Sequence, residues 1–240
     1  MKSVVCFSGG MDSTVLLYSA IRTFDQVLAL SFYYGQRHNK ELVHATEITK
    51  LHTNVIHKII DVSFFKDIAS KSALTNPDIA VAKARDTMGD PQTVNYVPFR
   101  NMMLLSIACA AAESVGATVV QYGAAQADSV AGYWDGSSEF LESINEVTLL
   151  NRRSKIKIEA PLIEKSKADI IRWGRELNVP FEKTWTCYEG VDLSCGTCPA
   201  CSLRLAGMID AGYRDPLVYS IQGKLDAAYL KKGCINMITA

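Results

Sequence analysis

The first residues whose types and spacing could do chemistry form a glycine turn near the N-terminus. The run is Ser8-Gly9-Gly10-Met11-Asp12-Ser13. Two glycines allow close approach to a ligand, and the unpaired N–H groups of a following helix favour an anion such as phosphate. Ser8 and Ser13 add hydroxyl donors, and Asp12 suits a turn that also holds magnesium. No Gly-Lys-Ser/Thr follows, which excludes the kinase-type phosphate loop, and the simpler alternative is a glycine turn with a polar helix cap.

A second group of reactive side chains comprises four of the seven cysteines. Their spacing is Cys187-x7-Cys195-x2-Cys198-x2-Cys201. Four thiolates close a tetrahedral site around zinc, and a site without an open position is structural rather than catalytic. An iron–sulfur cluster also takes four cysteines, and free buried thiols are the plainest alternative. We therefore predict a four-cysteine metal site with zinc as the preferred ion.

Other candidate ligand-binding residues lie next to apolar segments of the chain. Arg37 follows the sequence Tyr34-Gly35-Gln36, and Arg100 and Asn101 come just before the apolar residues 102–115. Residues 123–140 hold several aromatic and acidic side chains. Such groups suit a flat nitrogen heterocycle, by stacking and by hydrogen bonds to ring N–H groups. The alternatives are a solvated surface arginine and an ordinary polar loop.

The elements that must position these residues alternate along the chain. Apolar runs predict strands at residues 4–7, 27–32, 55–62, 119–122 and 156–159. Between them, helices are expected over residues 12–22, 38–51, 102–115 and 167–177, the last capped by Ser166. This alternation indicates an α/β fold with a mostly parallel sheet, helices on both faces, and ligands at the edge where the strands end.

The chain is expected to divide into two parts. Residues 1–184 would form the main domain, and residues 185–240, rich in Cys, Gly and turns at their start, a small subdomain with a C-terminal tail. Residues 74–98 lack periodicity and carry several prolines, which predicts a long functional loop.

Composition excludes several classes of protein. The 240 residues are 48% hydrophobic and 21% charged, which is typical of globular proteins. With 25 basic and 25 acidic residues the net charge is zero, which argues against nucleic acid as a partner. No apolar stretch reaches the length of a membrane span, and the first residues do not resemble a secretory signal. We expect a cytoplasmic protein.

The motifs together carry a resemblance. The glycine turn resembles the PP-loop of N-type ATP pyrophosphatases, and nearly the whole chain resembles one family within that superfamily, the 7-cyano-7-deazaguanine synthases (QueC). The matching stretches are SGGMDST, SFYYGQRH, SALT, YVPFRN, EAPLIEKSKADI, TWTCYEG and CGTCPACSLR. The four cysteines fall where that family binds zinc. The resemblance implies a Rossmann-like, adenine nucleotide alpha-hydrolase-like fold with a small C-terminal four-cysteine zinc subdomain.

The resemblance also implies a reaction, its cofactors and its residues. A ligase-type enzyme would use ATP and Mg²⁺ to adenylate 7-carboxy-7-deazaguanine, let ammonia attack to give the amide, and dehydrate the amide to 7-cyano-7-deazaguanine for queuosine biosynthesis. A homodimer is expected. The implied catalytic residues are Asp12, Ser13, Arg100 and Lys167. The implied cofactor-binding residues are Ser8, Gly9, Gly10, Asp12, Ser13, Tyr34, Gln36, Arg37 and Asn101, and the implied substrate contacts are Asp128, Tyr133 and Asp135.

The chain departs from the family pattern in three places. The family's Gly-Tyr-Pro-Asp-Cys-Arg reads Gly132-Tyr133-Trp134-Asp135-Gly136-Ser137 here, Phe99 replaces a small residue, and residues 222–240 extend past the usual end. The first two changes concern the acceptor amine. The altered loop and the tail favour a second hypothesis, in which the adenylated deazaguanine is transferred to a protein N-terminal amine, as in related enzymes of bacterial antiviral systems.

Overall fold

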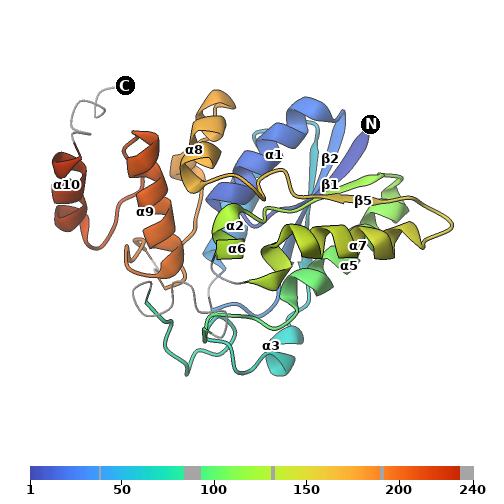
Figure 1. Ribbon diagram of the computed structural model, residues 1–240, viewed down its shortest axis with the longest axis horizontal. Helices are drawn as coiled ribbons and strands as arrows, with labels where there is room; N and C mark the ends of the chain where they lie inside the picture. The colour runs from blue at the N-terminus through green and yellow to red at the C-terminus, as the bar shows by residue number, and fades with distance from the viewer. Residues whose placement is uncertain (38, 84–92, 131–132, 190–191, 233–240) are drawn as a thin grey trace.

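Strands and helices alternate through most of the chain. The computed structural model describes residues 1–37, 39–83, 93–130, 133–189 and 192–232 (Figure 1). The strands are β1 (Lys2–Cys6), β2 (Gln26–Tyr33), β3 (Val55–Asp61), β4 (Val119–Gln121) and β5 (Lys157–Glu159). The helices are α1 (Met11–Thr23), α2 (Lys40–Thr49), α3 (Phe65–Ile68), α5 (Arg100–Val115), α6 (Gln126–Val130), α7 (Ser138–Leu149), α8 (Lys167–Glu176), α9 (Pro199–Ala211) and α10 (Gln222–Lys231), with 3-10 turns η1 (Trp134–Gly136) and η2 (Phe181–Lys183).

The described strands form one parallel sheet in the order β3-β2-β1-β4-β5. β1 lies at the centre because its apolar residues, such as Val4 and Val5, are fully buried between two layers. The strand order reverses between β1 and β4, so the segments that follow these two strands diverge at the sheet edge. This switch point is where open α/β sheets bind ligands.

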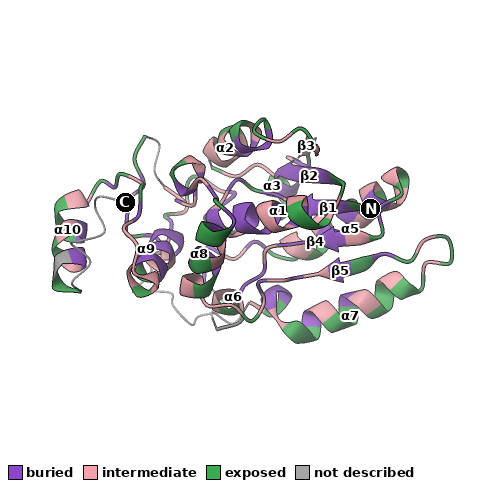
Figure 2. Ribbon diagram, turned by 90° about the horizontal axis from the view of Figure 1, so that it is seen from above, coloured by how far each residue is buried: buried purple, intermediate pink, exposed green. Residues whose placement is uncertain are grey.

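Helices cover both faces of the sheet, as expected (Figures 1 and 2). One core joins β1 and β2 to α1, α2 and α8, through residues such as Leu16, Ile48 and Ile170. The other joins the opposite face to α5 and α7, through residues such as Leu105 and Ile144. The α/β expectation and all five predicted strands are therefore confirmed.

The four predicted helices are present, with ends that differ by one or a few residues. Ser166 caps α8 by accepting a hydrogen bond from the Asp169 N–H at 3.1 Å, as expected. His38, the predicted first residue of the second helix, lies outside the described residues. The long loop has no helix or strand over residues 74–83 and 93–98, and its remaining residues 84–92 also lie outside the description.

The interpretation of residues 123–140 as a loop after the fourth strand is incomplete, because the described part of this segment contains helical turns. This segment holds α6, η1 and the start of α7. α7 begins there because the Ser137 hydroxyl accepts the Phe140 N–H at 3.1 Å. Short helical turns of this kind depend on tertiary contacts and leave little periodicity in the sequence.

The C-terminal region is more helical than the sequence suggested. α9 and α10 lie at one end of the molecule, beyond α8 (Figure 1). They share a separate core in which Leu225 and Tyr229 of α10 are buried beside Trp185 and the cysteines. Most of the described tail therefore packs on its own chain, whereas residues 233–240 lie outside the description. The division at residues 184 and 185 stays a prediction.

Among the described residues, none of the helices combines the length and the apolar character that a membrane crossing requires.

Candidate active site

The turn between β1 and α1 is stabilised by its own hydroxyl groups. The Ser8 N–H donates to the Ser13 Oγ at 3.2 Å, the two hydroxyl oxygens lie 3.0 Å apart, and the Gly10 N–H donates to the Ser8 Oγ at 3.2 Å. Gly10 is the helix cap residue, and no side chain caps α1. The first amides of α1 are therefore available to an anion at the positive end of the helix.

Gly9 is required by close packing. Its φ is +81°, and a Cβ atom there would lie 2.4 Å from the Glu41 carbonyl oxygen and 2.7 Å from the Ala45 nitrogen. Gly9 is therefore not a wall of the cavity but the position at which the turn rests on the backbone of α2. Only glycine fits this conformation and this distance.

Asp12 and Lys167 bring opposite charges together in front of the turn. The Lys167 Nζ lies 2.5 Å from the Asp12 Oδ2, and both side chains are largely buried. Burial acts to lower the pKa of Lys167, but the carboxylates of Asp12 and Asp128 outweigh it and raise this pKa. Lys167 is thus held as a cation at the first turn of α8.

The second carboxylate oxygen of Asp12 is buried and has no hydrogen-bond partner. A carboxylate oxygen buried without a donor is costly, and a divalent cation would satisfy it. Asp12 therefore fits the role of a magnesium ligand that its position at the helix start suggested.

These groups line a cavity of about 350 Å³ at the carboxyl ends of the strands. All predicted catalytic, cofactor-binding and substrate-binding residues except Gly9 reach its wall. They are Ser8, Gly10, Asp12, Ser13, Tyr34, Gln36, Arg37, Arg100, Asn101, Asp128, Tyr133, Asp135 and Lys167. The structure thus brings together side chains that are separated by up to 159 positions, from Ser8 to Lys167.

Arg100 lies at the first turn of α5 and faces Tyr34. Its guanidinium donates to the Tyr34 hydroxyl at 3.4 Å and lies 5.6 Å from the ring centroid. Burial acts to lower the pKa of Arg100, but nearby groups, Tyr34 first, raise it, so the cation is retained. A buried cation at this place suits an anionic ligand.

Asp128 and Asp135 face the cavity from α6 and η1. Burial raises the pKa of both carboxyl groups, against the lowering effect of Lys167 on Asp128 and of Arg100 on Asp135. The Asp128 carboxylate accepts the Ala125 N–H at 2.9 Å. A Cβ atom on Gly136 would lie 2.6 Å from the Asp128 Cβ, so η1 packs tightly on α6. Gly132, the first residue of the altered motif, lies outside the described residues.

The side chains of Gln36 and Arg37 form hydrogen bonds with backbone groups of the protein itself. The Gln36 amide bonds the Tyr34 N–H at 2.8 Å and the Phe32 carbonyl at 3.1 Å. The Arg37 guanidinium donates to the carbonyls of Ala73, Pro77 and Ile79 at 2.8–3.3 Å. Both side chains therefore shape the loops at the cavity wall.

Several residues that line the cavity were not predicted from the sequence. Glu41, on α2, is one of them, and burial raises its pKa to about 7. Another is Tyr122, whose buried hydroxyl has no hydrogen-bond partner. Tyr96 and Tyr188 also line the cavity. The predicted strand 119–122 reached Tyr122, but no local pattern showed that these side chains turn toward one cavity.

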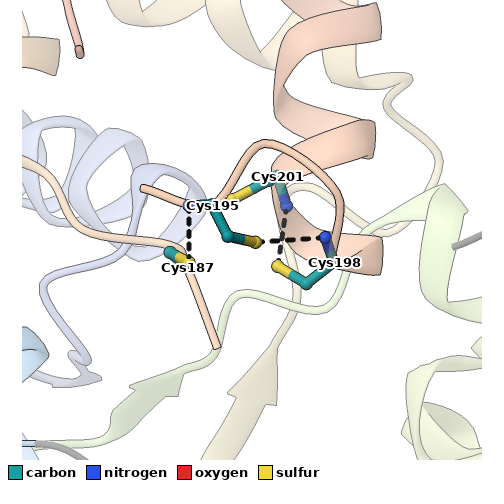
Figure 3. Close-up of side chains that lie close together, drawn as sticks. All are labelled: Cys187, Cys195, Cys198 and Cys201. Atoms are coloured by element: carbon teal, nitrogen blue, oxygen red, sulfur yellow. Dashed lines mark hydrogen bonds between the residues drawn. The ribbon is translucent and has the colours of Figure 1, made fainter. Parts of the chain in front are cut away.

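The four predicted cysteines converge on one point (Figure 3). Their sulfur atoms all lie within 4.8 Å of one another, and none is in a disulfide. A tetrahedral ion with Zn–S bonds near 2.3 Å requires sulfur separations of about 3.8 Å. Backbone N–H groups point at the sulfurs, among them Cys195 N–H to Cys187 at 3.2 Å and Cys198 N–H to Cys195 at 3.3 Å. The cluster therefore fits one metal ion held by thiolates.

A short segment links this cluster to the glycine turn. The Trp185 N–H donates to the Gly9 carbonyl at 3.0 Å, and its indole N–H donates to the Cys187 carbonyl at 3.1 Å. The ring stacks on His44 of α2 at 5.7 Å. The buried Arg204 of α9 holds the same segment through Thr184 and forms a bidentate pair with Asp215 at 2.6 and 2.9 Å.

The fold is that of the adenine nucleotide alpha-hydrolase-like enzymes, with a glycine turn between the central strand and the first helix. A 4-thiouridine synthetase crystallised with RNA and ATP shares this fold, with a TM-score of 0.50 and 17% identity, over 97% of this chain and 51% of that one. Residues 2–212 match the family described as queuosine biosynthesis protein QueC. The chain belongs to the QueC family.

Curated relatives agree with the family match. The chain is 42% identical to the 7-cyano-7-deazaguanine synthase of Caldicellulosiruptor bescii, over 92% of this chain and 99% of that protein. It is also 42% identical to the enzyme of the same name from Thermoplasma acidophilum, over 96% of this chain and 97% of that protein. An alignment over 96% of the chain extends into α10, so this part of the tail is shared with that relative although it lies beyond the family match.

Proposed function

We propose that this protein is an ATP-dependent 7-cyano-7-deazaguanine synthase, which acts on 7-carboxy-7-deazaguanine and ammonia in queuosine biosynthesis. Family membership and the names of the relatives support this function. The observation that carries it is the meeting of the β1–α1 turn with Lys167, Arg100, Asp128 and Asp135 in one cavity. That cavity offers an anion site and acidic acceptors side by side.

The nucleotide phosphates would bind at the β1–α1 turn. Ser8 and Ser13 present hydroxyls there, and the first amides of α1 carry no cap. The unpaired Asp12 oxygen would hold Mg²⁺, which would supply charge neutralisation at the departing pyrophosphate. Lys167, already beside Asp12, would contact a phosphate oxygen.

Two cationic side chains of the protein, Arg100 and Lys167, would assist activation of the substrate carboxylate. A free carboxylate is a poor electrophile, and adenylation gives it a good leaving group. Arg100 and Lys167 both line the cavity and have raised pKa values, so both remain charged while negative charge builds on the phosphate oxygens. Fixed charges in a partly buried site stabilise such a transition state strongly.

The acidic residues account for recognition of the base. A deazaguanine edge presents ring and exocyclic N–H donors, and Asp128 and Asp135 offer carboxylate oxygens at the same wall. Tyr133, stacked on Tyr96 with a 17° angle between rings, supplies a flat apolar surface beside them. Such a surface suits a planar ring.

The four cysteines would hold a structural zinc ion. The cluster leaves no sulfur free and offers no open position, so zinc would supply stability and no chemistry. No cysteine of the cluster lines the cavity, which agrees with this division of roles.

The test is product analysis with both cosubstrates present. Protein, ATP, Mg²⁺, 7-carboxy-7-deazaguanine and ammonia are mixed, and product mass and pyrophosphate are followed together, with an ammonia-free control. We expect the nitrile with two pyrophosphates for each molecule formed. Pyrophosphate without amide or nitrile would favour another acceptor amine, such as a protein N-terminus. No pyrophosphate at all would contradict the proposed function.

A further inference from the structure

Three segments of the chain meet at the hydroxyl group of Tyr96. The indole N–H of Trp134, in η1, donates to this oxygen at 2.8 Å. The backbone N–H of Phe99, the cap residue of α5, donates to it at 3.3 Å. The Tyr96 hydroxyl therefore joins the long loop, the first turn of α5 and the turn that carries Asp135.

Aromatic contacts surround this junction. The Trp134 ring lies edge-on to Phe99 at 5.2 Å and to Phe140 at 5.1 Å, and Tyr96 stacks on Tyr133 at 6.0 Å. Yet Trp134 is 40% exposed and Phe99 60% exposed. Since hydrophobic burial alone would not leave two large rings in water, the directed hydrogen bonds give the arrangement its geometry.

The junction fixes an unfavourable backbone conformation next to Arg100. Phe99 has φ of +52°, in the left-handed region that residues with a side chain rarely adopt. Such a conformation persists only where surrounding contacts hold it. Phe99 immediately precedes Arg100 and Asn101, so its conformation decides how α5 begins and where the Arg100 guanidinium points.

A second connection runs beside the first. The backbone N–H of Asn101 acts to lower the pKa of the carboxyl group of Asp135, the residue after Trp134, although burial raises this pKa overall. Asp135 therefore provides the negative group at a helix start that lacks a side-chain cap of its own. Trp134 and Asp135 together tie η1 to the first turn of α5.

We propose that Trp134, through the Tyr96 hydroxyl, is a positioning residue that holds Asp135 and Arg100 in the arrangement that binds the deazaguanine substrate. The inference deepens the proposed function and rests on it. The competing explanation is that Trp134 only stabilises the surface of the fold. The two explanations predict different results when the indole N–H is removed. Substrate binding weakens if Trp134 is a positioning residue, and it stays unchanged if Trp134 only stabilises the fold.

The variants are chosen to remove one hydrogen bond and keep the rings. Trp134→Phe removes the indole N–H, Tyr96→Phe removes the oxygen that accepts it, and the double variant removes both. Trp173→Phe, on α8 and outside the cavity wall, is the matched control for loss of an indole N–H.

Steady-state kinetics provide the first measurement. We expect Trp134→Phe to raise KM for 7-carboxy-7-deazaguanine about fivefold to tenfold, the effect of one neutral hydrogen bond. KM for ATP and kcat should stay within about twofold. The double variant should equal Tyr96→Phe, because Trp134 acts through that hydroxyl. An unchanged substrate KM in Trp134→Phe, or additive effects in the double variant, would overturn the proposal.

Hydrogen–deuterium exchange provides a measurement that does not depend on turnover. Trp134→Phe should speed exchange in peptides covering residues 97–101 and 133–137, with no change elsewhere and none in Trp173→Phe. Equal exchange rates in the wild type and in Trp134→Phe would refute the proposal that Trp134 holds these two segments together. If wild-type protein neither binds nor converts the substrate, the proposed function fails, and exchange alone then decides whether Trp134 holds these two segments together.

Discussion

Asp12 and Lys167 join the first turns of α1 and α8 by an ion pair at 2.5 Å. Each residue also has a polar group or an interaction that lies outside this pair. Asp12 keeps one buried oxygen without a donor, and Lys167 also interacts with Asp128. The proposed function would use both of these groups, Asp12 toward the metal and Lys167 toward a phosphate.

The carboxylate of Asp12 is expected to be essential for activity but not for folding. Asp12→Asn keeps the shape and removes the charge, so pyrophosphate release should fall by about a hundredfold or more, as for the loss of a fixed charge at a transition state. Circular dichroism should stay native. Asp67→Asn, an exposed residue of α3, is the control. Turnover near the wild-type rate would remove Asp12 from the mechanism.

At the level of elements, α2 supports the turn between β1 and α1. Its backbone at Glu41 and Ala45 fills the space beside Gly9, and Trp185, which stacks on His44 of the same helix, donates its backbone N–H to the Gly9 carbonyl. The turn is thus held between a helix and the segment that leads to the cysteines. A side chain at Gly9 would have to displace the backbone of α2.

Gly9→Ala is expected to damage both stability and nucleotide binding. The added Cβ would lie 2.4 Å from the Glu41 carbonyl oxygen in a residue whose φ is +81°. We expect a loss of about 2–4 kcal/mol of unfolding free energy, from strain and overpacking together. Gly116→Ala separates the two causes, because its φ is +70° but nothing lies within 4 Å. It should lose about 1–2 kcal/mol and keep ATP binding. Equal losses in urea titrations of the two variants would contradict the packing argument.

At the level of the whole molecule, shared packing and a backbone hydrogen bond connect the cysteine cluster with the β1–α1 turn. Cys187, Cys198 and Cys201 belong to the buried core that joins α9 and α10. Trp185 belongs to the same core and donates its backbone N–H to Gly9. A metal ion bound by these cysteines would therefore help to fix the turn at the centre of the sheet edge.

Metal removal is expected to weaken ATP binding as well as stability. Cys198→Ser should lose the metal, lower the melting temperature and reduce ATP affinity, because the core around Trp185 loosens. Elemental analysis, thermal unfolding and calorimetric titration with ATP measure the three effects. Cys109→Ser, on α5 and outside the cluster, is the control. Loss of metal with unchanged ATP affinity would show that the two sites are independent.

The sequence by itself determined the features that depend on neighbouring residues. Apolar runs separated by helical periods predicted the strands and the four main helices, because each buried strand must carry its own apolar residues. The glycine turn and the cysteine spacing were equally local, since a tight turn and a metal site constrain residue types at fixed intervals. Ser166 was predicted as a helix cap for the same reason.

Only the tertiary structure decided which distant residues share the cavity. Glu41 and Tyr122 carry no local pattern, and they reach the wall because parallel strands end at one edge. The helical turns at α6 and η1 depend on contacts such as Gly136 on Asp128 and Asp135 on the start of α5. The hydrogen bond from Trp134 to Tyr96 spans 38 positions. Such contacts depend on how separated segments pack, which short-range patterns in the chain do not record.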